Sequence, residues 1–220
     1  MAQILITGTN QGIGLELAKQ YVNRGDDVIA VCRTASDDLR ASGAEIVENV
    51  DVTDGASVAR LAGAVGDRKI DVLINNAGIL TRETFDDLDF DRMRRQFEVN
   101  TLGPLRVTKA LSDKLTDGGK VGIVTSRVGS MDDNGSGGNY GYRMSKAAAN
   151  MAGVNLSHDL KPRDIAVVLL HPGYVKTNMT GGGGAIDAAT AAGGLIERMD
   201  ALSMATTATF WHAEGYQLPW

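Results

Sequence analysis

The sequence predicts one α/β domain across residues 1–220, built on a doubly wound parallel sheet with helices on both faces. Three observations lead to this prediction. The short apolar runs are continuous, as in strands that are buried on both faces of a sheet. Segments with the spacing of amphipathic helices separate these runs. A length of 220 residues also suits one ordinary domain with its own core, and no linker or internal repeat divides the chain.

The first strand is predicted at residues 4–6, and Thr7 and Gly8 follow it. Apolar residues then recur every four positions from Ile13 to Tyr21, which predicts a helix that stops at Gly25. The other predicted strands are residues 28–32, 46–50, 72–74, 121–124 and 165–170. The other predicted helices are residues 58–65, 88–97, 105–115 and 144–154. This alternation predicts right-handed crossovers and a ligand site beyond the carboxyl ends of the strands.

The composition excludes several kinds of partner. The net charge is −5, so we expect no basic surface for nucleic acid. No apolar run approaches the ~20 residues that span a bilayer, so no membrane association is expected. The single cysteine, Cys32, cannot form an internal disulfide, and no histidine or cysteine spacing indicates a metal site. These features predict a cytoplasmic protein.

Gly8, Gly12 and Gly14 form a turn between the first strand and the first helix. Backbone amides at such a helix start favour a pyrophosphate, although a plain tight turn is the alternative. Arg33 follows the second strand, where a carboxylate for a ribose 2′-hydroxyl is often found. An arginine there suits a 2′-phosphate, whereas the alternative is a solvated side chain at a strand end.

Tyr142 and Lys146 lie four residues apart at the start of a predicted helix, and therefore on one face. A nearby ammonium favours the phenolate form, so Lys146 is expected to lower the pKa of Tyr142. This spacing also arises by chance, and the pair alone is weak evidence. Ser126 ends the preceding strand at the sheet edge where the glycine turn lies, so a hydroxyl donor, a phenol and a phosphate site converge.

Ordered motifs run along nearly the whole chain: Thr7-Gly8 with Gly12-Ile13-Gly14, Asp51-Val52, Asn75-Asn76-Ala77-Gly78, Asn100, Ser126, Tyr142 with Lys146, and Pro172-Gly173 with Thr177. With these motifs the chain resembles the short-chain dehydrogenase/reductase family, and most closely its C-factor and sniffer-type carbonyl reductases. The resemblance implies a Rossmann-type fold and four catalytic residues, Asn100, Ser126, Tyr142 and Lys146. It implies cofactor contacts from Gly8, Asn10, Gln11, Gly12, Ile13, Gly14, Arg33, Asp51, Val52, Asn76, Ala77, Gly78, Tyr142, Lys146, Pro172, Gly173, Val175 and Thr177.

The activity that the resemblance implies is reversible reduction of a ketone or aldehyde with NADPH. Tyr142 would exchange a proton with the substrate oxygen, Ser126 would bind that oxygen, and Asn100 would seat a water that relays protons through Lys146. NADP(H) is expected to be preferred and NAD(H) to be possible, because Gln11 stands where NADP-preferring members often carry a basic residue. The family is commonly dimeric or tetrameric, so a homo-oligomer is expected.

Two other functions are compatible with this fold. A non-catalytic nucleotide-dependent regulator usually loses part of the Ser/Tyr/Lys set, which this chain keeps. A nucleotide-sugar dehydratase or epimerase would need a further substrate domain, for which 220 residues leave no room.

Three segments outside the motifs carry further expectations. Residues 131–141 are rich in Gly, Asn and Asp and are predicted to be a loop at the substrate entrance. Four glycines, 181–184, predict that residues 178–192 form a mobile lid over the site, with a plain surface loop as the alternative. His171 precedes Pro172 at a strand end. We expect His171 to have a structural role, with contact to the substrate as the alternative.

Overall fold

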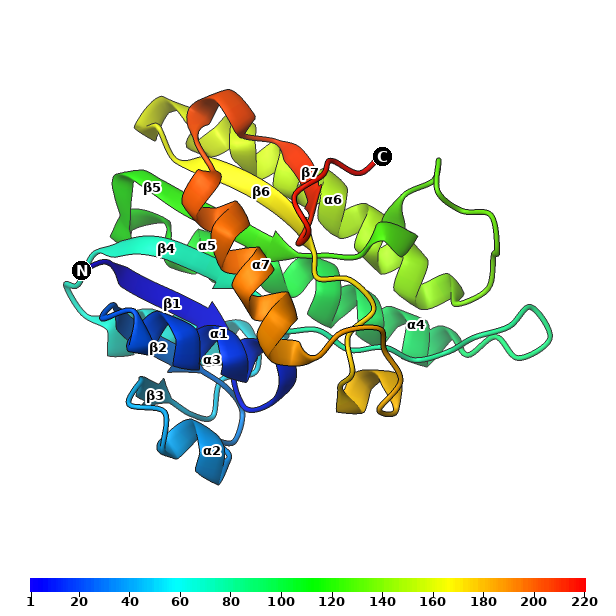
Figure 1. The fold of residues 1–220 in the computed structure, drawn as a ribbon, viewed down its shortest axis with the longest axis horizontal. Coiled ribbons are helices and arrows are strands. Elements are labelled where there is room, and N and C mark those ends of the chain that lie inside the picture. The colour runs from blue at the N-terminus through cyan, green and yellow to red at the C-terminus, as the bar shows by residue number, and fades with distance from the viewer.

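The computed structural model describes residues 1–220 and contains a single seven-stranded parallel sheet between two layers of helices (Figure 1). The strand order is β3-β2-β1-β4-β5-β6-β7, which confirms the predicted doubly wound, Rossmann-type fold. The strands are β1 (Gln3–Thr7), β2 (Asp27–Val31), β3 (Glu45–Val47), β4 (Ile70–Asn75), β5 (Leu115–Val124), β6 (Ala166–His171) and β7 (Thr209–His212). The helices are α1 (Gly12–Asn23), α2 (Asp37–Arg40), α3 (Gly55–Val65), α4 (Phe90–Phe97), α5 (Gly103–Ala110), α6 (Tyr140–Leu160) and α7 (Ala188–Ala201).

Each face of the sheet has its own apolar core. On one face α1 and α7 pack together, and Leu17, Tyr21, Leu195 and Met199 join the core beneath them (Figure 1). On the other face α3, α5 and α6 supply a second set of buried side chains, which includes Leu61. Because both faces are covered, the central strands contain only buried residues at their carboxyl halves, as the continuous apolar runs predict.

Aspartates begin three of the helices. The carboxylates of Asp54, Asp89 and Asp187 each accept hydrogen bonds from backbone N–H groups in the first turn of α3, α4 and α7. Such caps satisfy donors that have no partner within the helix and typically stabilise it by ~1 kcal/mol. By contrast, the residues that precede α1 and α6, Gln11 and Asn139, provide no side-chain cap, and these two helices begin at the predicted phosphate and catalytic sites.

Two parts of the fold differ from the prediction. Strand β7 was not predicted from the sequence, and it pairs in parallel with β6 from Val168–Thr209 to His171–His212. Leu111 and Leu115 fit the helical spacing, but α5 ends at Ala110 and Leu115 already belongs to β5. The chain leaves the helix here because residues 112–114 form a tight 3₁₀ turn and Leu115 pairs with β4.

The predicted lid boundary is also wrong at its carboxyl end. Residues 188–192 belong to α7, and Ala191 and Ala192 are completely buried under the sheet, so they cannot move as part of a surface loop. The remaining segment, residues 178–187, has no long regular element, and its mobility stays a prediction. No helix in the molecule combines the length and the apolar character that crossing a bilayer requires.

Candidate active site

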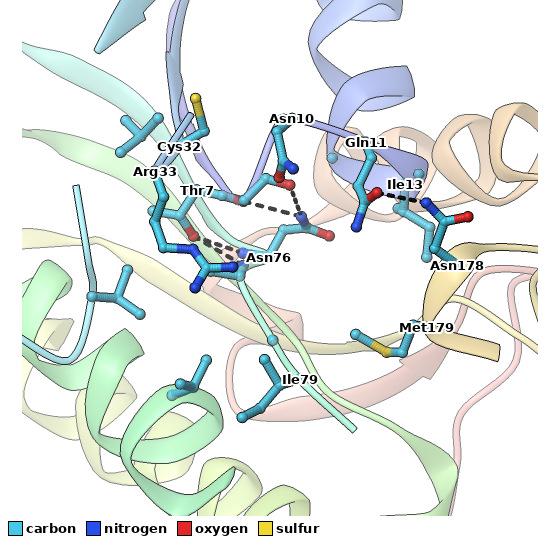
Figure 2. Close-up of a pocket in the computed structure, with 18 of the residues that line it drawn as sticks. Thr7, Asn10, Gln11, Ile13, Cys32, Arg33, Asn76, Ile79, Asn178 and Met179 are labelled. Carbon is cyan, nitrogen blue, oxygen red and sulfur yellow. Dashed lines mark hydrogen bonds between the residues drawn. The ribbon is translucent and has the colours of Figure 1, made fainter. Parts of the chain in front are cut away.

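A cleft of about 420 Å³ opens at the carboxyl ends of β1, β2 and β4 (Figure 2). Thirteen of the predicted cofactor residues line it: Gly8, Asn10, Gln11, Gly12, Ile13, Gly14, Arg33, Asp51, Val52, Asn76, Ala77, Gly78 and Thr177. Ten lining residues were not predicted: Thr7, Val31, Cys32, Val50, Ile79, Leu80, Arg95, Val99, Asn178 and Met179. The structure does not place Tyr142, Lys146, Pro172, Gly173 or Val175 on the cleft wall. The cleft therefore covers the predicted adenosine and pyrophosphate end of the site.

The glycine turn packs so tightly that side chains do not fit. A Cβ atom at Gly14 would lie 2.2 Å from the Gly8 carbonyl oxygen and 2.5 Å from the Asn76 side-chain nitrogen. Gly8 has a φ of +72°, and a Cβ there would meet the Ala77 backbone at 2.7 Å. Since no side chain caps α1, its first-turn amides face the cleft without a side-chain acceptor. These residues fit a bound pyrophosphate, which accepts hydrogen bonds from such amides.

Asn76 joins the loop after β4 to the glycine turn. Its side-chain amide donates to the carbonyl oxygens of Thr7 and Gly8, at 3.0 and 3.1 Å. In return, the Thr7 hydroxyl accepts from the backbone amides of Asn76 and Ala77, at 3.1 Å each (Figure 2). In this structure the Asn76 side chain therefore holds the loop after β4 against the glycine turn in the cleft wall.

Arg33 and Arg95 place two cations at the predicted adenosine side of the cleft. Arg33 is exposed at the end of β2, and Figure 2 shows Arg33 and Met179 on opposite walls of the cleft. The pKa of Asp51 is lowered, first by hydrogen bonds from Thr53 and then by the charges of Arg33 and Arg95. Sequence reasoning missed Arg95, because its acidic neighbours on α4 read as an ordinary solvated helix face.

Ser126, Tyr142 and Lys146 meet beyond the end of β5. Ser126 lies two residues after the strand and is buried, whereas Tyr142 lies in the first turn of α6 and is half-buried. Burial of its phenol end raises the pKa of Tyr142 to about 12, against an opposing effect from the Ser126 hydroxyl. The phenol therefore keeps its proton at neutral pH, which is the state that a proton donor needs.

Lys146 is almost completely buried, and its ammonium donates to the Val124 carbonyl oxygen at 2.9 Å. Burial lowers the pKa of Lys146 to about 8. The nitrogen is 5.6 Å from the centre of the Tyr142 ring. The expectation that Lys146 lowers the pKa of Tyr142 is not met, because burial raises this pKa and only the Ser126 hydroxyl opposes the increase.

Asn100 lies in a π-helical turn, Glu98–Leu102, between α4 and α5. Its side-chain oxygen accepts from the Ile79 amide at 2.9 Å, and its side-chain nitrogen donates to the Ile79 carbonyl and the Ser145 hydroxyl. Both hydrogens of the amide are thus used within the protein. Asn100 holds the loop after β4 against α6, and the predicted water relay stays a prediction.

His171 belongs to a separate aromatic cluster at the ends of β6 and β7. Its ring centre is 4.9 Å from that of His212, which stacks on Tyr216 at 4.6 Å. Burial, with a smaller effect from His212, lowers the pKa of His171 to about 3. His171 is therefore neutral at ordinary pH, and its packing favours the structural role.

Replacing Lys146 by methionine is expected to stabilise the fold at neutral pH. The pKa of Lys146 is about 8 in the fold, against 10.5 for an exposed lysine, so burying the ammonium costs about 3 kcal/mol below pH 8. Between those two values the native lysine loses its proton while the unfolded chain keeps it, and the wild-type protein gains stability. Denaturant titrations should therefore show that the advantage of Lys146→Met shrinks by about 3 kcal/mol from neutral pH to pH 10.5. An advantage that is independent of pH would contradict a buried charge.

Comparison with known protein families is consistent with this geometry. The family model described as short chain dehydrogenase matches residues 2–185. Among curated proteins, 1-hydroxy-2-glutathionyl-2-methyl-3-butene dehydrogenase of Rhodococcus sp. is 45% identical over 226 residues and covers 100% of both chains. C-signal of Myxococcus xanthus is 44% identical over 154 residues, which is 69% of this chain and 93% of that protein.

Solved structures give the same result over the full length. The carbonyl reductase Sniffer of D. melanogaster superposes with a TM-score of 0.92 at 29% identity and 100% coverage of both chains. The NADPH-bound carbonyl reductase from chicken fatty liver superposes with a TM-score of 0.91 at 29% identity, covering 100% of this chain and 99% of the other. The predicted likeness to C-factor and sniffer-type proteins is confirmed.

Proposed function

Because the chain belongs to the short-chain dehydrogenase/reductase family, we propose that it reduces a ketone or aldehyde to an alcohol with NADPH as the hydride donor. The proposal rests on the close approach of the cleft wall to the predicted catalytic residues. Gly78 lines the nucleotide cleft, and a Cβ atom there would be 3.3 Å from the Asn100 side-chain oxygen and 3.7 Å from the Lys146 nitrogen. The cleft thus runs directly up to the catalytic residues.

When bound, NADPH supplies the hydride. The residues of the chain provide the rest. The amides at the start of α1 would bind the pyrophosphate, and Arg33 would donate to the 2′-phosphate. The buried Ser126 hydroxyl orients the carbonyl oxygen, and Tyr142 holds the proton that the developing alkoxide takes. Lys146, whose nitrogen is 5.6 Å from the centre of the Tyr142 ring, carries a positive charge below a pH of about 8.

We expect Arg33→Ala to weaken NADPH binding by about 10- to 100-fold and to leave NADH binding nearly unchanged. A charge-assisted hydrogen bond to the 2′-phosphate is worth ~1.5 to 3 kcal/mol, and only NADPH carries that group. Fluorescence titration of both cofactors measures the effect. Arg95→Ala removes the other cation that lines the cleft and is the matched comparison. Equal losses for both cofactors in Arg33→Ala would show that Arg33 acts structurally.

The experiment that tests the proposed activity is a panel of carbonyl compounds with NADPH or NADH, followed at the nicotinamide absorbance. The name of the Rhodococcus relative gives it a glutathionyl alcohol as substrate, so glutathione conjugates belong in the panel, in the oxidative direction. Turnover with NADPH supports the proposal. Tight NADPH binding without turnover of any compound would favour a non-catalytic regulator instead.

Residues 178–187 are proposed as a lid over this site. Their first residues line the cleft, and the Asn178 side chain donates to the Gln11 side-chain oxygen at 2.7 Å (Figure 2). Gly181 and Gly182 have positive φ values, and a Cβ at either residue would meet nothing within 4 Å, so the tip of the segment has open space around it. A cytoplasmic location and a dimeric or tetrameric assembly are likewise proposals.

A further inference from the structure

Glu83 is a buried carboxylate that the proposed chemistry does not use. It lies in the loop between β4 and α4 with 1% of its surface exposed. Its oxygens accept hydrogen bonds from neutral donors: the Thr81 hydroxyl at 2.5 Å, the Gln96 side-chain nitrogen at 3.2 and 3.3 Å, and the Gly141 backbone amide at 3.2 Å. A buried charge is costly, so this one needs its donors in place.

One of these donors is the backbone amide immediately before Tyr142. Gly141 is the second residue of α6, and the residue preceding the helix, Asn139, provides no side-chain cap. The Glu83 carboxylate, which belongs to a loop distant in sequence, acts as the cap instead. The backbone carbonyl of Glu83 also accepts a hydrogen bond from the Asn139 amide at 2.8 Å. A negative charge is also favoured at a helix N-terminus.

The same carboxylate is connected to the nucleotide cleft. The Gln96 side chain, which donates to Glu83, accepts from the Thr81 backbone amide at 3.0 Å, and Thr81 directly follows the cleft residues Ile79 and Leu80. Gln96 packs directly against Gly141, because a Cβ atom at Gly141 would lie 2.4 Å from the Gln96 side-chain nitrogen. Glu83 and Gln96 thus join the cleft loop to the first turn of α6.

A second connection lies on the other side of Tyr142. The Asn100 side chain binds Ile79 and donates to the Ser145 hydroxyl at 3.0 Å, and that hydroxyl donates to the Tyr142 carbonyl oxygen at 2.8 Å. Residues 79–83 of the loop after β4 are therefore connected by hydrogen bonds to α6 at residue 141 and again at residue 145. The catalytic phenol stands between the two points.

We propose that Glu83 is a positioning residue for Tyr142, fixing the first turn of α6 relative to the loop that lines the nucleotide cleft. The consequence for catalysis rests on the proposed function. The consequence for the helix does not. A misplaced catalytic group can cost orders of magnitude in rate even when the change is about 1 Å.

The proposal is tested first by replacing the Glu83 carboxylate with an amide and then by exchanging the side chains of residues 83 and 96. In Glu83→Gln, the new side-chain NH₂ must face either the Gly141 amide or the Gln96 NH₂, which are both donors. We expect amide exchange in residues 139–146 to become about tenfold faster, and kcat to fall about tenfold while the NADPH dissociation constant stays within about twofold. The double variant Glu83→Gln/Gln96→Glu restores a donor facing an acceptor and should recover most of both losses. Asp86→Asn, an exposed carboxylate in the same loop, is the control.

Two outcomes would overturn the proposal. If exchange in residues 139–146 is the same in Glu83→Gln and in the wild type, Glu83 does not fix the helix start, whatever the activity. If kcat, NADPH affinity and thermal stability all fall in proportion and the double variant recovers none of them, Glu83 supports only the general fold. A wild-type protein that reduces no carbonyl would refute the proposed function, while the exchange measurement would still decide the role of Glu83.

Discussion

Replacing Tyr142 by phenylalanine is expected to lower the rate of carbonyl reduction by about 10²- to 10⁴-fold, the usual contribution of general acid catalysis. The substitution removes only the hydroxyl group from a half-buried ring, so the packing of α6 and the nucleotide cleft should be preserved. Steady-state kinetics with NADPH measures the rate, and fluorescence titration of the cofactor measures the NADPH dissociation constant. We expect the NADPH dissociation constant to stay within about twofold of the wild-type value.

Ser126→Ala should change the rate in the same direction but less severely, because the phenol that carries the proton remains. If Tyr142→Phe keeps more than about a tenth of the wild-type rate with chemistry rate-limiting, another group donates the proton and the assignment of Tyr142 is wrong.

Gly14→Ala is expected to weaken nucleotide binding by about 100-fold. The added Cβ would lie 2.2 Å from the Gly8 carbonyl oxygen, which is backbone and can move only if the turn itself opens. Overpacking of this kind costs about 1–3 kcal/mol, and the upper value corresponds to about two orders of magnitude in affinity. Isothermal titration with NADPH measures the loss.

Gly63→Ala is the matched control for this prediction. A Cβ at Gly63 meets nothing within 4 Å, and the residue lies in α3, where alanine favours the helix. Its NADPH affinity should equal that of the wild type. If Gly14→Ala binds NADPH as tightly as this control, the glycine turn does not cradle the pyrophosphate.

Much of the fold follows from the sequence because burial on both faces leaves an unmistakable pattern. Strands such as β6, in which all six residues are buried, read as continuous apolar runs. β7 was missed because it is only four residues long and its burial alternates, so that nothing but pairing with β6 defines it. Leu115 misled the prediction because a helical spacing of apolar residues can also continue across a turn into a strand.

The site was predictable where residue types recur in an ordered motif, and not where contacts come from tertiary packing. The glycine turn, Arg33 and the Ser126, Tyr142 and Lys146 set belong to the first kind. Arg95 and Glu83 belong to the second, because only the folded chain brings α4 against the cleft and the loop after β4 against α6. The increase that burial causes in the pKa of Tyr142 likewise depends on packing that spacing does not encode.

The most direct test of the proposed function uses NADPH that carries deuterium at both positions on C4 of the nicotinamide, and follows the label into the alcohol formed from a ketone substrate. Mass spectrometry of the alcohol should show one deuterium on the carbinol carbon with the wild-type protein. Tyr142→Phe should give the same labelled product at a rate lower by about 10²- to 10⁴-fold. An alcohol formed without deuterium, or NADPH consumed without any labelled product, would contradict direct hydride transfer to a carbonyl at this site.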